Sequence, residues 1–377
     1  MTRRTLIAGI ILIGLLAMGP APVKSQALIE DRLVVITPIP REVTDAAVER
    51  FAEYTRQRFG VALRPLVVSQ GAPVAYARIL EWRGRPEADL MWAGEAELFD
   101  DLAERRLLVP HELSDAQLRE IPAAIGTPRS MPLRDPRGFW VGTALTPAGI
   151  IYHPTLLRRR GIEPPRDWDD LLDCRFKGNI VQATPSNSGS NHSSLEALLQ
   201  VKGWDKGWNW ALRLAGNTGL FVTRSRDVPT FVARGEFAVG FGVLSYMAFQ
   251  EVLAGQELRF VSPPYAWFTS APTALLAGAR SPRAARAFLQ FLLAEEGQRV
   301  MMARGLFPIV PKFRMEGAPG SPEEQAAAFS GMRSFFDRPV RNAYDDALAQ
   351  RRYNDVNELY RTLITERHPQ LVRLYCP

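Results

Sequence analysis

The sequence predicts an α/β protein made of two lobes. Short β-branched runs alternate with amphipathic helical patterns between residues 33 and 106, which indicates parallel strands joined by helical crossovers. A second unit of the same kind occupies residues 178–261. Between the two units, residues 139–153 form an extended run that is too long for one simple strand. The 377 residues also exceed the roughly 250–300 residues at which a single core stops growing, which favours two lobes.

The first lobe is predicted from three pairs of a strand and a helix. In the first helix, Val43, Ala47 and Phe51 recur near one face, as in an amphipathic helix that packs on a sheet. Parallel strands end at the same edge of a sheet, where open α/β sheets bind ligands. The predicted strands are 33–37, 61–69 and 88–92, and the predicted helices are 43–59, 74–83 and 95–106.

The second unit repeats this alternation and is inserted within the first. A last strand and a long helix, 273–277 and 282–304, follow it. The extended run 139–153 is interpreted as strands that pass from one lobe to the other. The strands predicted in this unit are 178–183, 220–222, 237–243 and 259–261, and the helical segments are 168–172, 204–215, 228–234 and 247–254.

The chain changes character after Val310. A Pro/Gly-rich linker, 311–321, precedes an Arg-rich segment with two or three predicted helices. Val356, Leu359 and Tyr360 share one helical face, so we expect this segment to pack on the body of the protein.

Residues 1–27 have the features of a secretory signal peptide. Arg3 and Arg4 form a basic start, and 6–19 form an apolar core that is short for a membrane span. Small residues at positions 25 and 27 predict cleavage after Ala27 and export to the periplasm. An uncleaved N-terminal anchor is the alternative.

Charge and cysteine content narrow the classes of partner. The net charge is +6, and the basic residues Arg3, Arg4 and Lys24 lie in the leader, which leaves +6 − 3 = +3. This small excess gives no support to nucleic-acid binding. Cys174 and Cys376 could pair in an oxidising compartment or remain free. Neither has the neighbours of a zinc site, and we expect no metal and no cofactor.

A loop rich in small hydroxyl residues, 183–196, connects the strand 178–183 to an apolar helical pattern. Such residues cap the free N–H groups at the start of a helix. The same free N–H groups, together with the helix dipole, attract anions. The loop is therefore either an elaborate helix cap or a binding site for a negatively charged ligand.

The sequence contains no recognisable catalytic set. It has no phosphate-binding glycine motif and no nucleophile elbow. His192 could act as a base for Ser190 or Ser194, but no acidic residue is placed to orient it. Two lobes with polar loops at strand ends suit a protein that closes on a ligand, so we expect a binding protein and not an enzyme.

Several segments, in their order and spacing, carry a family resemblance. They are A-D-L-M-W-A-G at 88–94, the run 142–153, W-D-D-L-L at 168–172, F-K-G-N-I at 176–180, 185–190, G-E-F-A-V-G at 235–240, A-A-R-A-F at 284–288 and E-E-G-Q at 295–298. The chain resembles extracellular solute-binding proteins of ABC importers, in the group that binds ferric iron, phosphonates, phosphoglycerate and polyamines. The resemblance covers residues 33 to about 311.

The resemblance implies a type II periplasmic-binding-protein fold with a ligand cleft between two lobes and crossovers near 144–146 and 263–269. It divides the chain into a first lobe (28–144 and 270–320), a second lobe (145–269) and a C-terminal helical extension (321–377). It also implies a monomer that delivers its ligand to a membrane permease. The cleft residues implied by matching positions are Thr37, Ser69, Gly71, Trp92, Ala93, Gly94, Ser188, Gly189, Ser190, Asn191, Arg224, Ser225, Ser245 and Tyr246.

The chain departs from the iron binders at the position of their tyrosine pair. Here the sequence reads Leu244-Ser245-Tyr246, and one phenolate gives too few anionic oxygens for Fe(III). Hydroxyls, backbone donors and Arg224 suit a phosphonate, phosphate ester or carboxylate, because arginine binds such groups with two parallel hydrogen bonds. A ferric-iron carrier that uses Tyr246, and a ligand-sensing partner of a membrane receptor, are the alternatives.

Overall fold

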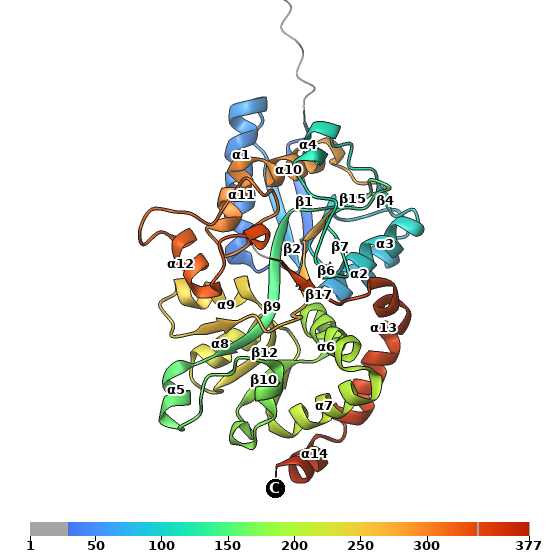
Figure 1. Cartoon of the computed structure of the whole chain (residues 1–377). Coiled ribbons are helices and arrows are strands. Elements are labelled where there is room, and N and C mark those ends of the chain that lie inside the picture. The colour runs from blue at the N-terminus through green and yellow to red at the C-terminus, as the bar shows by residue number, and fades with distance from the viewer. Residues whose placement is uncertain (1–28, 338, 377) are drawn as a thin grey trace, which may run out of the picture.

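The computed structural model describes residues 29–337 and 339–376. The predicted signal peptide, residues 1–27, lies outside the described residues. Figure 1 shows two α/β lobes, one above the other, with the long strand β9 running through both. Within the described part of the chain, no helix is both long and apolar enough to cross a membrane.

The first lobe is built on a sheet with the strand order β2-β1-β3-β15-β4, to which β8 adds beside β15. Strands β1, β2 and β3 run parallel, as predicted, and β15 returns antiparallel to β3. Leu33 and Val35 face the layer of α1 and α10, whereas Val34 and Ile36 face α2 and α3. Both faces are covered, which explains the continuous apolar run. The elements are β1 (Arg32–Thr37), α1 (Arg41–Phe59), β2 (Arg64–Ser69), α2 (Ala72–Glu81), β3 (Leu90–Trp92), α3 (Ala96–Glu104), β4 (Leu108–Val109), α4 (Asp115–Arg119), β5 (Ala124–Ile125), β6 (Thr127–Pro128), β7 (Met131–Pro132), β8 (Val141–Gly142), β15 (Pro272–Leu276) and α10 (Pro282–Leu293).

The second lobe has a sheet with the strand order β11-β10-β12-β9-β13. Strands β10, β11 and β12 are parallel, and β9 runs antiparallel to both β12 and β13. This arrangement confirms a second α/β unit inserted within the first. Its elements are β9 (Ala144–Tyr152), α5 (Pro154–Arg159), η1 (Trp168–Leu172), η2 (Cys174–Phe176), β10 (Ile180–Ala183), η3 (Pro185–Asn187), α6 (Gly189–Lys202), α7 (Trp204–Asn217), β11 (Thr218–Val222), α8 (Asp227–Ala233), β12 (Val239–Leu244), α9 (Ser245–Leu253), β13 (Arg259–Val261) and β14 (Phe268–Thr269).

Two adjacent chain passages connect the lobes. Strand β9 begins at the first lobe and pairs with β14 at Thr146 and Pro147 before it enters the second sheet. Beside it, Thr143 N donates to Ser270 O at 2.9 Å, and Thr143 Oγ1 donates to Ala271 O at 3.0 Å. The passages are thus hydrogen-bonded to each other, as two crossovers of a hinge would be. The lobe boundaries at 144/145 and 269/270 remain predictions.

The prediction of one helix over 282–304 is wrong. The chain forms α10 and then α11 (Glu295–Met302), with Ala294 extended between them at ψ 160°. Gly297 lies so close to Phe291 that a Cβ there would overlap the Phe291 carbonyl oxygen. The start of α11 therefore folds back on the end of α10. Two acidic residues, Glu295 and Glu296, stabilise the new helix N-terminus through its dipole.

The C-terminal segment extends along both lobes. In Figure 1, α13 and α14 run down one side of the molecule. Helix α13 packs against α3 of the first lobe and α6 of the second, and α14 packs against α7. A disulfide between Cys174 and Cys376 joins the end of the chain to the second lobe. The two cysteines, which the sequence allowed to be either paired or free, are therefore paired. The elements are β16 (Phe307–Pro308), α12 (Pro322–Ser330), η4 (Phe335–Asp337), β17 (Arg341–Asn342), α13 (Asp346–Tyr360), η5 (Arg361–Thr365) and α14 (His368–Tyr375).

Candidate ligand pocket between the lobes

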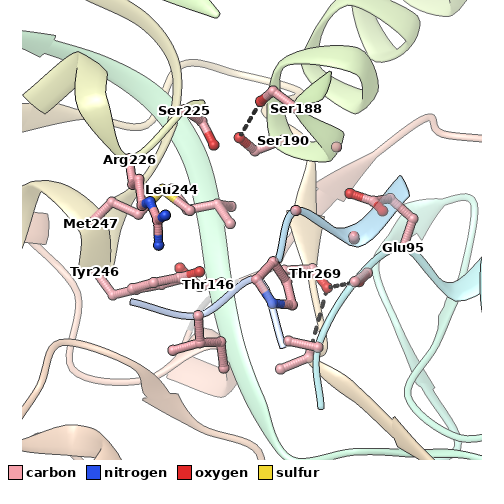
Figure 2. Close-up of a pocket in the computed structure, with 18 of the residues that line it drawn as sticks. Glu95, Thr146, Ser188, Ser190, Ser225, Arg226, Leu244, Tyr246, Met247 and Thr269 are labelled. Carbon is pink, nitrogen blue, oxygen red and sulfur yellow. Dashed lines mark hydrogen bonds between the residues drawn. The ribbon is translucent and has the colours of Figure 1, made fainter. Parts of the chain in front are cut away.

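A pocket lies where the strand ends of the first lobe face the start of α6 and the loops of the second lobe (Figure 2). The crossovers contribute Thr146, Trp267, Thr269 and Ala271 to its wall. The pocket is therefore bounded by both lobes and by the hinge. The other lining residues are Pro38, Ile39, Gln70, Gly71, Ala72, Ala93, Gly94, Glu95, Asn187, Ser188, Gly189, Ser190, Arg224, Ser225, Arg226, Leu244, Tyr246, Met247 and Leu306.

The first-lobe wall is formed by the turns that follow β1, β2 and β3. A Cβ on Gly71 would lie 3.1 Å from the carbonyl oxygen of Asn187, so the two lobes nearly touch at this point. After β3, Ala93 has a φ of 69° and Gly94 a φ of 151°. This left-handed conformation is uncommon for alanine, and it is held by the hydrogen bond from Ala93 N to Pro272 O at 2.8 Å. The turn directs Glu95 toward the pocket.

The second-lobe wall is the N-terminus of α6. Ser188 is the N-cap, and its Oγ accepts a hydrogen bond from Asn191 N at 3.3 Å. The first amides of an α-helix have no intrahelical acceptor, and those of Gly189 and Ser190 come before the capped one. The hydroxyls of Ser188 and Ser190 lie 3.5 Å apart and both line the pocket. The loop is thus a helix cap and a set of free donors at once.

Glu95 reaches across the pocket to this helix start. Its side chain is buried, and Oε1 lies where a Cβ on Gly189 would be. Among the described residues, Oε2 has no hydrogen-bond partner. Burial raises the pKa of Glu95 to about 7. The pocket therefore contains one acidic group with an oxygen that no described residue pairs.

Arg226 is the basic group that spans the cleft. Its Nη1 donates to Ser69 Oγ at 2.8 Å, which links α8 of the second lobe to the end of β2. Arg224 also lines the pocket, but its side chain is more than half exposed and its Nε donates to Asp227 at 3.0 Å. Of the two arginines, Arg226 is the better placed to contact a ligand between the lobes.

An apolar wall faces these polar groups. Leu244, Met247, Trp267 and Leu306 supply it, together with the ring of Tyr246. Burial, and after it the charge of Glu95, raise the pKa of Tyr246, so its hydroxyl remains a neutral donor. A single tyrosine supplies too few anionic oxygens for Fe(III).

The structure brings together nine of the fourteen residues expected at the cleft. Gly71, Ala93, Gly94, Ser188, Gly189, Ser190, Arg224, Ser225 and Tyr246 line the pocket.

Five of the expected residues lie outside the pocket lining, each with a local partner. Trp92 belongs to the core: it is fully buried, its Nε1 donates to Thr143 Oγ1 at 3.2 Å, and its ring packs edge-on against Phe288. The other four are also engaged: Thr37 Oγ1 accepts from Ile39 N, Ser69 binds Arg226, Asn191 Nδ2 donates to Phe241 O, and Ser245 Oγ lies 3.0 Å from Thr146 Oγ1.

His192 faces away from the neighbouring serines. Its Nδ1 lies 2.9 Å from Asn357 Oδ1, and its ring packs on Tyr353 of α13. Burial lowers the pKa of His192 to about 4. The side chain is a contact between α6 and the C-terminal segment and is not placed as a base for Ser190 or Ser194.

Glu95 and Arg226 are the most important pocket residues outside the fourteen expected at the cleft. Both are charged residues beside expected ones, and Arg226 follows Arg224 and Ser225 in a loop already identified. Among the described residues, no cluster of three or more His, Cys, Asp or Glu side chains is arranged to hold a metal ion.

Comparisons with known proteins agree with this geometry. The profile of the family described as "Bacterial extracellular solute-binding protein" matches residues 86–333. The phosphoglycerate transport regulatory protein PgtC of Salmonella typhimurium is 29% identical over 236 residues, which cover 62% of this chain and 56% of PgtC. An uncharacterized protein of Haemophilus influenzae is 26% identical over 296 residues, 77% of this chain and 81% of the relative.

Solved structures share the fold at low sequence identity. The periplasmic binding protein AfuA of Actinobacillus pleuropneumoniae, solved with fructose-6-phosphate, has a TM-score of 0.71 at 20% identity and covers 89% of this chain and 98% of its own. Iron-bound HitA of Pseudomonas aeruginosa has a TM-score of 0.66 at 18% identity, with 87% and 99% covered. These likenesses confirm the predicted two-lobed periplasmic-binding fold.

Proposed function

Because the chain belongs to the family of bacterial extracellular solute-binding proteins, we propose that it binds a small organic anion for an ABC importer. The expected ligand is a phosphate ester, a phosphonate or a carboxylate. The observation that carries the proposal is the pocket where the free N-terminus of α6 and Arg226 face the same space. Membership of this family makes the chain a binding protein and not an enzyme.

The donors of the pocket support an anion. The amides of Gly189 and Ser190 and the hydroxyls of Ser188 and Ser190 lie at one end. A helix N-terminus combines such donors with a positive partial charge. Arg226 adds a full positive charge and can bind two oxygens at once. The apolar wall at Met247 and Trp267 would cover the carbon part of the ligand.

The relatives favour a phosphorylated ligand among these anions. The name of PgtC refers to phosphoglycerate transport, and AfuA was solved with fructose-6-phosphate. The chain matches only 56% of the length of PgtC, so the activity of that protein is a guide here. Phosphonates and carboxylates offer the same oxygen geometry and belong in the same ligand screen.

Delivery of the ligand to a membrane permease would follow closure of the two lobes about the hinge. We propose that the ligand closes them by bridging Arg226 and the start of α6 to the strand ends of the first lobe, and that a membrane permease receives the closed monomer. Export through a signal peptide cleaved near Ala27 would place the protein in the periplasm. The disulfide Cys174–Cys376 fits that oxidising compartment.

A thermal-shift screen tests the proposal. Phosphoglycerates, sugar phosphates, phosphonates and dicarboxylates are added one by one, and at least one class is expected to raise the melting temperature. Arg226→Gln is expected to remove the shift, and the matched control Arg234→Gln, at the exposed end of the same helix, to keep it. No shift with any anion would reject the proposal.

A sensing role is the second candidate, because the name of PgtC describes a regulatory protein. Its test uses a host strain that lacks the gene and expresses the permease from a constitutive promoter. If the protein carries the ligand to the permease, uptake of labelled ligand stays absent. If the protein acts only on expression of the permease through a receptor, uptake is restored.

A further inference from the structure

We propose that Glu95 accepts a hydrogen bond from the ligand, and so restricts the pocket to anions that carry an O–H group at or beside their anionic end. This inference rests on the proposed function and specifies its ligand. All such ligands present an O–H donor to Glu95. The donor is either a protonated oxygen of the anionic group, as in a phosphate monoanion, or a hydroxyl group next to the anionic group.

The position of Glu95 is fixed by the backbone on both sides of it. Ala93 N donates to Pro272 O, and Gly94 O accepts from Thr269 Oγ1 at 3.0 Å. Glu95 is then the N-cap of α3. Two hydrogen bonds from the hinge thus hold the turn that carries this side chain, and the carboxylate does not depend on a flexible loop for its placement.

The carboxylate lies beside the donors expected to bind the anion. Oε1 occupies the space above Gly189, the first residue of α6. Figure 2 shows the side chain of Glu95 directed toward the helix that carries Ser188 and Ser190. A ligand oxygen bound at this helix start would therefore lie next to Glu95.

One oxygen of this carboxylate is left unsatisfied by the described part of the chain. Among the described residues, Oε2 has no hydrogen-bond partner and no lysine or arginine forms an ion pair with Glu95. The groups that interact with its charge are Glu97 on α3, Tyr246 on α9 and Tyr353 on α13, and none of them is cationic. A buried polar group without a partner is unfavourable. A purely structural role would leave that penalty in place, whereas a donor on the ligand would remove it.

The charge of Glu95 determines which anions can enter. In its ionised form the Glu95 carboxylate only accepts hydrogen bonds, so it then repels an oxyanion without a proton and binds an O–H group. A hydrogen bond to a charged group is worth roughly ten- to a hundredfold in binding. Replacement of the carboxylate by an amide supplies an N–H donor and should remove the preference for proton-bearing anions.

The test uses two parent probes, 3-phosphoglycerate and fructose 6-phosphate, and matched analogues measured by calorimetry at pH 8.5, above the pKa of about 7 that burial gives Glu95. In the first arm the phosphate is replaced by a sulfate ester, which holds no proton at this pH. In the second arm the hydroxyl next to the anionic group is replaced by hydrogen, as in 3-phosphooxypropionate. The proteins are wild type, Glu95→Gln and the control Glu97→Gln, which removes a buried carboxyl outside the pocket lining.

The inference predicts that wild type prefers a parent to its analogue by at least about tenfold in one arm or both. Glu95→Gln should reduce that ratio below about threefold, and Glu97→Gln should leave it unchanged. Equal binding of parents and analogues by wild type would overturn the inference while anion binding stands. The same holds if other anions of the screen bind and neither parent does. If no anion binds, both the proposed function and this inference are rejected.

Discussion

Glu95 and Gly189 show how single residues shape the polar end of the pocket. One side chain crosses from the first lobe, and the other residue has none, which leaves room for the carboxylate. Arg226 bridges the lobes through Ser69 at the end of β2. Charge of both signs therefore lies within one enclosed site, where a ligand must match each of them.

The position of the Glu95 carboxylate depends on the absence of a side chain at residue 189. In Gly189→Ala the new Cβ would overlap Oε1 of Glu95, so the Glu95 carboxylate would have to move away from the start of α6. We expect at least about tenfold weaker binding of the anion that gives the largest shift in the screen, as measured by calorimetry. The double variant Gly189→Ala/Glu95→Ala removes the overlap, and recovery of the melting temperature of the unliganded protein would show that the clash is the cause. An unchanged affinity in Gly189→Ala would contradict the placement of Glu95.

The raised pKa of Glu95 predicts a dependence of stability on pH. The carboxyl titrates near 4.5 in the unfolded chain and near 7 in the folded protein, because it is buried. Between these values the folded state binds more protons than the unfolded state, so the free energy of unfolding falls as pH rises from about 4.5 to 7. The loss is at most about 3–4 kcal/mol from this group, since one pKa unit is worth about 1.4 kcal/mol.

Burial also raises the pKa values of Glu97 and of Asp346, the latter to about 6, and these groups act in the same direction. Urea unfolding of the ligand-free protein at pH 5, 6, 7 and 8 measures the combined effect of these groups on the free energy of unfolding. Glu95→Gln should show a shallower decrease than wild type. A stability that rises from pH 5 to pH 8 would show that these acids are ionised and satisfied in the folded state.

At the scale of elements, hydrophobic periodicity predicted most strands and helices within a few residues. The β-branched run at 33–37 and the amphipathic face with Val43, Ala47 and Phe51 correspond to β1 and α1. Continuous apolar patterns gave no sign of the break at Ala294, because both α10 and α11 bury a face against the same core. Trp92 was misplaced for a related reason: its position at the end of β3 suggested the cleft, but its large ring is stabilised more by burial against Phe288.

The disulfide and α14 form the element-scale anchor of the C-terminal segment. Cys174 and Cys376 are separated by 202 residues, and the bond restricts a long loop in the unfolded chain. We expect Cys376→Ser to reduce the free energy of unfolding by roughly 2–5 kcal/mol, measured by urea denaturation under oxidising conditions. Reduction of the wild type should give a similar decrease, and the variant should be insensitive to reductant. Equal stability of wild type and variant would show that the packing of α14 on α7 is sufficient.

At the scale of the whole molecule, the C-terminal segment is a second connection between the lobes. It is joined to the second lobe by the disulfide and by the ion pair of Arg352 with the fully buried Glu196. On the first lobe, Arg129 pairs with Asp345 at 2.9 Å and β17 pairs with β6. Any opening of the cleft must therefore move these contacts as well as the hinge.

This second connection predicts a limited opening. Small-angle scattering of the ligand-free protein should show only a small change on addition of the anion selected by the screen. In Arg129→Gln/Asp345→Asn, which removes one exposed contact with the first lobe, the ligand-free protein should be more extended and the liganded protein unchanged. A variant whose ligand-free dimensions equal those of wild type would show that the segment does not restrain the lobes.

The most direct test of anion binding is native mass spectrometry of the mature protein isolated from its own host without dialysis. The structure predicts one bound organic anion with phosphate or carboxylate oxygens and an O–H group, present on the wild type and lost in Arg226→Gln. A bound ferric ion or a polyamine in its place would contradict the assignment of the pocket.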